Sequence, residues 1–135
     1  RLGDFVSWKD GEYLTSPNFY SWALKDIKSK VSINTEIHFF LFSDDSKNAI
    51  RYLPTNISYV HVSKYQELNA AQELYLMSKC DYLVTSKSTF SWWAGKFVSA
   101  RNGRVIAPRP WFKNESNINT KLETKDFEYS KSSFE

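Results

Sequence analysis

The sequence predicts an α/β fold, both from the order of its elements and from their composition. Short apolar segments alternate along the chain with segments whose apolar residues recur at the three- and four-residue spacing of a helix. Helices of this length between strands are typical of right-handed connections, which place helices on both faces of one parallel sheet. We therefore expect a Rossmann-like domain with a parallel sheet and helices on both faces.

The first half of the chain contributes two helices and two strands to this prediction. A Ser-Pro dipeptide is a helix start, and the apolar spacing after it predicts the first helix at residues 18–30. Residues 36–42 are nearly all apolar, which is typical of a strand buried on both faces. A short second helix then leads to the next strand, at residues 57–62.

The second half repeats the alternation. Residues 68–79 are expected to form a helix, residues 81–85 and 103–107 two strands, and the helix between these strands is expected to begin at Ser88. The buried face of helix 68–79 is expected to consist of Leu68, Ala71, Leu74 and Tyr75. The buried face of the helix after Ser88 is expected to consist of Phe90, Trp93, Ala94, Phe97 and Val98.

The domain organisation follows from these elements. Residues 1–112 are expected to form one Rossmann-like domain. Residues 113–135 are rich in Asn, Ser, Thr and Lys and are expected to be a polar C-terminal tail that loops around the domain or frays. Residues 1–6 read as the end of a strand that runs into a loop, so we expect the chain to begin within a longer protein.

Composition excludes several classes of function. The net charge of +3 is spread along the chain without a basic helix or run, so nucleic acid is not an expected partner. A single cysteine, Cys80, excludes an internal disulfide, and two histidines argue against a Cys/His zinc site; we expect a buried structural thiol. Neither a Gly-rich dinucleotide motif nor a P-loop occurs.

The segment from Ser86 to Ser91 is the strongest candidate for a binding site. Ser88 is a natural N-cap, and the helix start after it presents free N–H groups from about Thr89 to Ser91. These donors, the positive end of the helix dipole and the nearby hydroxyls together suit a phosphate or diphosphate. The alternative is an ordinary capped helix without a ligand.

Charged residues at the same expected edge of the sheet extend this candidate. Arg1 ends an expected strand and is suited to share the charge of a diphosphate, or it is a surface arginine. Asp44 and Asp45 follow a strand, where a carboxylate can accept hydrogen bonds from a guanine edge or a ribose. The alternative for at least one of them is an acidic N-cap of the next helix.

Five segments in order carry a resemblance to a known family. They are Arg1-Leu2-Gly3-Asp4-Phe5, Phe42-Ser43-Asp44-Asp45, Leu76-Met77-Ser78-Lys79-Cys80, Ser88-Thr89-Phe90-Ser91-Trp92-Trp93 and Val105-Ile106-Ala107-Pro108. With these segments the chain resembles the bacterial α-1,2-fucosyltransferases of glycosyltransferase family 11, over nearly its whole length up to about residue 111. The resemblance implies the C-terminal, GDP-fucose-binding half of a GT-B-like enzyme, with the N-terminal half absent.

The resemblance also implies roles for individual residues. Arg1 aligns with the arginine that contacts the diphosphate, although Leu2 stands where a second arginine is usual. Asp44 or Asp45 would approach the guanine or ribose, and the diphosphate site would be lined by Ser88, Thr89, Phe90 and Ser91. Asp4 lies at the right edge to be a general base, although a capping or backbone role is an equal alternative.

The implied reaction is an inverting transfer of L-fucose from GDP-fucose to the 2-hydroxyl of a galactose-type acceptor. Arg1 and the helix N–H groups would stabilise the GDP leaving group, so neither a metal nor another cofactor is expected. The acceptor would be a glycan ending in galactose. It would be met at the cytoplasmic face of a bacterial membrane, with peripheral membrane association, or in the Golgi if the chain is eukaryotic.

Two other classes of function stay open at this stage. A receiver-like signalling domain also carries paired acidic residues at strand ends, and it would require Mg²⁺. A catalytically silent sugar-binding domain is suggested by the tryptophan count alone. Trp92 lies off the expected apolar stripe of its helix, so it is expected either to stack on a sugar or to pack against a neighbouring domain.

Overall fold

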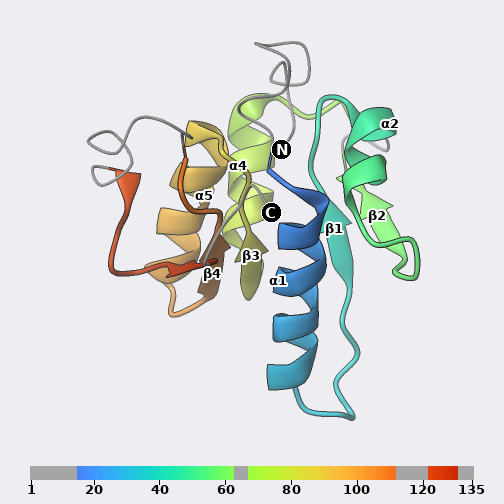
Figure 1. Ribbon diagram of the computed structural model, residues 1–135. Coiled ribbons are helices and arrows are strands. Elements are labelled where there is room, and N and C mark those ends of the chain that lie inside the picture. Colours follow the sequence, from blue (N-terminus) through green and yellow to red (C-terminus); the bar gives the residue numbers. More distant parts are fainter. Residues whose placement is uncertain (1–14, 63–66, 112–121, 131–135) are drawn as a thin grey trace.

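The computed structural model describes residues 15–62, 67–111 and 122–130 (Figure 1). Helices and strands alternate along most of these residues, as the sequence predicts. The elements, in order, are α1 (Pro17–Lys30), β1 (Phe39–Leu41), α2 (Ser46–Ala49), the 3₁₀ helix η3 (Ile50–Tyr52), β2 (Tyr59–His61), α4 (Ala70–Ser78), β3 (Tyr82–Val84), α5 (Thr89–Ser99), β4 (Arg104–Ala107) and β5 (Glu128–Tyr129).

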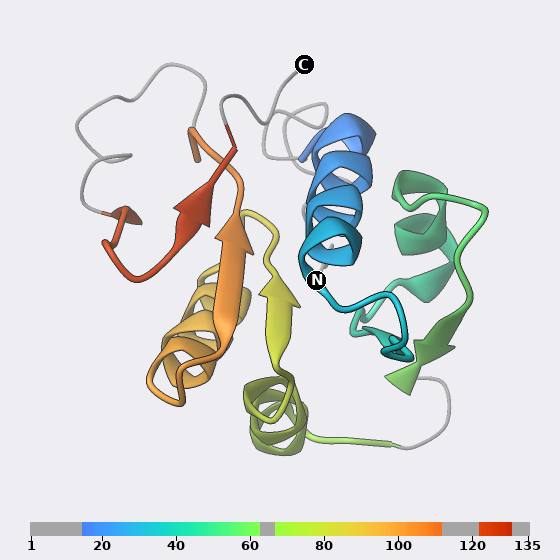
Figure 2. The same cartoon turned by 90° about the horizontal axis from the view of Figure 1, so that it is seen from below.

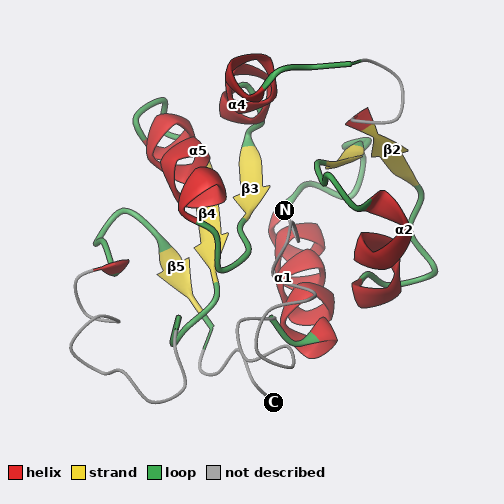
Figure 3. Cartoon of the chain, turned by 90° about the horizontal axis from the view of Figure 1, so that it is seen from above, coloured by secondary structure: helices red, strands yellow, loops and turns green. Residues whose placement is uncertain are grey.

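All described strand pairs are parallel, but they form two sheets. β1 pairs with β2, and β3, β4 and β5 form a second sheet in that order. Helices cover both faces of the second sheet: Figures 2 and 3 show α1 on one side of β3 and β4 and α5 on the other. The prediction of parallel strands with helices on both faces is therefore confirmed, with the difference that the described strands do not join into a single sheet.

Alternating side chains of the sheet supply two hydrophobic cores. On the face toward α1, Ile106 packs with the buried residues of that helix, and Tyr82 and Val84 lie against them. On the opposite face, Leu83 and Val105 pack with Met77 of α4 and with buried residues of α5. This alternation is the period of two that a strand imposes on its side chains.

The segment predicted as a polar tail contributes to the sheet and to the core. β5 pairs with β4, and Phe127 beside it is only 6% exposed. Trp92 packs edge-to-face on Phe127, and its Nε1 donates a hydrogen bond to the carbonyl of Leu122 at 2.9 Å. The ring of Trp92 is therefore engaged within the chain, and its expected contact with a sugar or a neighbouring domain stays a prediction.

Two helices bury their predicted faces only in part. Ala94 and Val98 of α5 are buried as predicted, and Leu74 of α4 and Phe90 of α5 pack against the same core. α4 buries Glu73 and Met77 and leaves Tyr75 60% exposed. α5 leaves Trp93 and Phe97 exposed and buries smaller residues, namely Ser91, Ala94, Gly95 and Val98. The small residues face inward because α5 lies closely between the sheet and the ring of Phe127.

The β1 strand also differs from its prediction. Phe40 is 52% exposed, so the strand is not buried on both faces. Its register partner Val60 on β2 is exposed as well, which leaves one face of this two-stranded sheet open. The apolar run predicted the strand correctly, but it overestimated how much of the strand is covered.

An ionic cluster ties α1 to the second sheet. The guanidinium of Arg104 on β4 donates to Asp26 of α1 and to Glu128 of β5. Burial would raise the pKa of Asp26, but hydrogen bonds from Arg104 and Lys30 hold it below its usual value. The cluster therefore fixes α1, β4 and β5 relative to one another. Charge-assisted hydrogen bonds have a defined geometry, whereas hydrophobic contacts alone would allow these elements to shift.

We predict that Gly95→Ala destabilises the protein. A Cβ at this position would lie 2.7 Å from Cζ of Phe127 and 3.0 Å from Cγ1 of Val105. Overpacking of this kind lowers the free energy of unfolding by about 1–3 kcal/mol, whereas an unhindered Gly-to-Ala change in a helix would raise it by about 1 kcal/mol. Denaturant unfolding measures the free energy of unfolding and shows whether the substitution lowers or raises it. The double variant Gly95→Ala/Phe127→Leu should recover part of the loss, and a stabilised single variant would contradict this packing.

Candidate functional site

The carboxyl ends of the parallel strands define the edge at which the candidate site lies. β3 ends when Thr85 donates its N–H to the carbonyl of Ile106 at 2.9 Å, and α5 begins four residues later. Ser88 is the N-cap residue, as predicted, with extended backbone angles. Its side chain makes no capping hydrogen bond to the first amides of α5.

The hydroxyl of Ser91 shapes the loop before the helix. Its Oγ lies 3.2 Å from the carbonyl of Ser86 and 3.0 Å from that of Ser88, and the residue is 1% exposed. These contacts draw the loop back over the first turn of α5. The Ser91 hydroxyl therefore supports the loop and is not exposed to a ligand.

The remaining predicted residues of this segment differ in exposure. Thr89 is exposed at the first helical position, whereas Phe90 is half-buried and packs against the core around Leu83. Phe90 thus anchors the start of α5 to the sheet, and Thr89 is exposed at the first position of the helix.

Two buried polar residues at this edge were not predicted from the sequence. Lys87, between the loop serines, is only 4% exposed, and burial lowers its pKa from 10.5 to about 7. Thr85 is 1% exposed, and its Oγ1 has no hydrogen-bond partner in the part of the chain that the structure describes. The residue types alone gave no signal for either, because a lysine in a serine-rich loop usually faces water.

The two aspartates after β1 have different surroundings. Asp45 caps α2: its Oδ1 accepts the N–H of Asn48 at 3.2 Å, and its Oδ2 accepts the Asn48 side-chain amide at 2.6 Å. Asp44 is exposed. The capping alternative is therefore confirmed for Asp45, and Asp44 is the carboxylate that a ligand can reach.

The predicted residues fall into two groups at the carboxyl edge. Asp44 and Asp45 follow β1 in one sheet, and the serine-rich loop follows β3 in the other. Phe42, just before the aspartates, lies in the same core as Leu83 of β3, so the two groups share one side of the domain. Arg1 and Asp4 lie outside the described residues.

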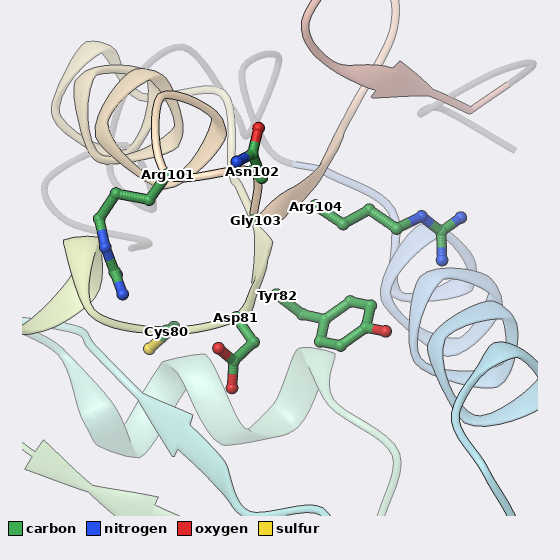
Figure 4. A pocket seen from close by; sticks show the side chains of 7 residues that line it. All are labelled: Cys80, Asp81, Tyr82, Arg101, Asn102, Gly103 and Arg104. Atoms are coloured by element: carbon green, nitrogen blue, oxygen red, sulfur yellow. The ribbon is translucent and has the colours of Figure 1, made fainter.

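The surface hollows lie elsewhere. One is lined by residues from Cys80 to Tyr82 and from Arg101 to Arg104, at the amino-terminal ends of β3 and β4 (Figure 4). Cys80 is half-buried in it, so the expected buried thiol is only partly confirmed. Burial and the neighbouring Asp81 raise the pKa of this thiol, which makes it a poor nucleophile.

The described residues hold neither a candidate metal site nor a candidate membrane-spanning helix. No group of three or more His, Cys, Asp or Glu side chains in the described ranges is arranged to hold a metal ion. No helix in these ranges combines the length and apolar character that crossing a membrane requires.

We predict that Lys87 makes stability rise with pH above neutrality. The unfolded lysine keeps its proton up to about pH 10.5, whereas the folded one loses it near pH 7. Between these values the unfolded state binds more protons, so the free energy of unfolding increases with pH. Thermal unfolding from pH 6 to 10 should show this rise, and Lys87→Met should abolish it. Lys79→Met, at an exposed site, is the control; parallel curves for wild type and Lys87→Met would contradict the prediction.

Comparison with known proteins identifies the family of the chain. The chain matches glycosyl transferase family 11 over residues 1–131. It is 28% identical over 113 residues to the O-antigen biosynthesis glycosyltransferase WbnK of Escherichia coli, a match covering 76% of this chain and 36% of WbnK. The chain thus spans about a third of that relative's length. No solved structure matches. The family match covers nearly the whole chain, and the chain therefore belongs to glycosyl transferase family 11.

Proposed function

We propose that this chain is the donor-binding part of an inverting galactoside α-1,2-fucosyltransferase that uses GDP-fucose. Family membership supports glycosyl transfer as the reaction class. The observation that carries the donor assignment is the start of α5, where a serine-rich loop leaves the first amides without a side-chain cap. A helix start of this kind stabilises the negative charge of a diphosphate.

The chemistry follows from the charge that develops during transfer. As the bond between the anomeric carbon and GDP breaks, negative charge grows on the leaving diphosphate. The N–H groups of Thr89 and Ser91 would donate to its oxygens, and the buried Lys87 would add positive charge nearby. Such donors lower the barrier because they are already oriented when the charge appears. This arrangement needs no metal ion and no further cofactor.

The rest of the donor site would come from the other group of residues. Asp44 would accept hydrogen bonds from the guanine edge or the ribose, while Asp45 holds the loop by capping α2. Arg1 would contact the diphosphate, and Asp4 would act as the general base toward the acceptor hydroxyl. The acceptor would be a glycan ending in galactose, in keeping with the O-antigen role in the name of WbnK.

The competing classes differ in what they require. A receiver-like domain would need a metal-binding acidic cluster, and Asp45 is occupied in capping a helix. A silent sugar-binding domain was suggested by the tryptophan count alone, and Trp92 is packed against Phe127. Both observations favour glycosyl transfer.

The reaction is tested by product analysis with the full-length protein. GDP-fucose and a β-galactoside should yield an α-1,2-linked fucoside, identified by NMR from the anomeric configuration and the linkage carbon. The β configuration of GDP-fucose becomes α in the product of an inverting enzyme. Transfer from a different nucleotide sugar, or to another hydroxyl, would contradict the proposal.

We predict that Thr89→Pro weakens GDP binding about ten- to a hundredfold. Proline is favoured at the first helical position, and the extended Ser88 is compatible with a following proline, so the fold should persist. The change removes one N–H donor, and a hydrogen bond to a charged group contributes roughly 1.5–3 kcal/mol. Isothermal titration calorimetry measures the Kd of GDP for each variant. Thr89→Ala keeps the N–H and is the matched control; equal losses in both variants would contradict a role for this amide.

A further inference from the structure

Arg109 follows β4 and lies at the same carboxyl edge as the candidate site. β3 and β4 are parallel neighbours, and Thr85 at the end of β3 donates its N–H to Ile106 of β4. Figures 2 and 3 show β4 on the side of β3 that faces away from β1. The order along this edge is therefore Asp44, the loop to Ser88, and then Arg109.

Contacts within the chain hold the guanidinium of Arg109 near the start of α5. Its Nε lies 3.0 Å from Oε1 of Glu123, and its backbone N–H donates to Oγ of Ser130 at 3.4 Å. The residue before Glu123 is Leu122, whose carbonyl accepts the Nε1–H of Trp92, the fourth residue of α5. The segment that carries β5 thus connects the cation to the first residues of this helix.

A small polar cluster surrounds this ion pair. The hydroxyl of Tyr129 accepts the N–H of Thr124 at 2.7 Å. Burial raises the pKa of Tyr129, and the charges of Glu123 and Arg109 act on that hydroxyl in opposite directions. The side chain of Glu123 is 24% exposed, whereas that of Arg109 is 54% exposed. The carboxylate therefore lies within the cluster, and the cation lies at its surface.

Arg109 keeps donors that a ligand can use. Among the described residues 15–62, 67–111 and 122–130, its two terminal nitrogens make no hydrogen bond. Arg104, one of the other arginines, donates instead to Asp26 and Glu128. Two parallel N–H groups of a guanidinium match two oxygens of a phosphate. Arg109 therefore presents a half-exposed phosphate-binding group at the edge of the sheet.

We infer that Arg109 binds the β-phosphate of the nucleotide-sugar donor. The inference rests on the proposed function, in which Asp44 holds the guanosine and the start of α5 holds the diphosphate. The β-phosphate is the phosphate farther from the nucleoside, so it lies toward β4. The bond that breaks joins the anomeric carbon to an oxygen of this phosphate, and the electron pair stays on that oxygen. Arg109 would stabilise this charge as it forms.

Isothermal titration calorimetry of the full-length protein with GDP and with GMP tests the inference. Arg109→Gln should raise the Kd of GDP about tenfold or more, because charge-assisted hydrogen bonds are lost, and that of GMP less than about twofold. Arg109→Lys keeps the charge but not the paired donors, so it should weaken GDP binding less. Arg101→Gln removes the same charge at the amino-terminal end of β4 and is the matched control; it should leave both Kd values unchanged.

The outcomes separate this inference from the proposed function. Equal losses for GDP and GMP in Arg109→Gln, or no loss for either, would overturn the inference, while GDP binding by the unmodified protein would still support the proposed donor. No GDP binding by the unmodified protein would contradict the proposed function, and the inference would fall with it. Thermal unfolding checks that each variant folds. If Arg109→Gln does not fold, Arg109→Lys provides the comparison, and GDP must again lose more affinity than GMP.

Discussion

Parallel pairing of β3 with β4 is the constraint on which the candidate site depends. It sends both strands toward the same edge, and the helices that follow parallel strands begin at that edge. The pairing ends at Thr85, so the next residues must satisfy their own backbone groups before α5 starts. Ser91 meets this requirement by bonding two loop carbonyls. The Ser88 side chain makes no capping hydrogen bond at the helix start.

Much of the fold could be predicted because local signals decide it. The Ser-Pro start and the spacing after it predicted α1 to within one residue, Pro17–Lys30 against 18–30. The helix faces could not be predicted equally well. In α5 the large aromatic residues suggested the buried side, but the space beside Phe127 accepts only small ones. Phe127 and β5 lie in a polar segment whose two-residue strand depends on pairing with β4.

The candidate site, like the fold, could be predicted from the sequence only in part. The helix start at Ser88 and the capping alternative for Asp45 were readable from residue types alone. Lys87 and Thr85 were not, because their importance comes from burial, and a lysine in a serine-rich loop usually faces water. A cation whose pKa is lowered to about 7 by burial is sensitive to any nearby anion.

Family membership and geometry address different questions. Membership in glycosyl transferase family 11 defines the reaction class, and the edge formed by β3 and α5 indicates where a charged donor would be held. The proposed function depends most on metal-independent binding of guanosine diphosphate at that edge. Calorimetric titration of the full-length protein with GDP and GMP, in EDTA and then in Mg²⁺, tests it most directly. GDP should bind equally in both buffers and much more tightly than GMP; no binding of either nucleotide, or binding only with Mg²⁺, would contradict metal-independent donor binding.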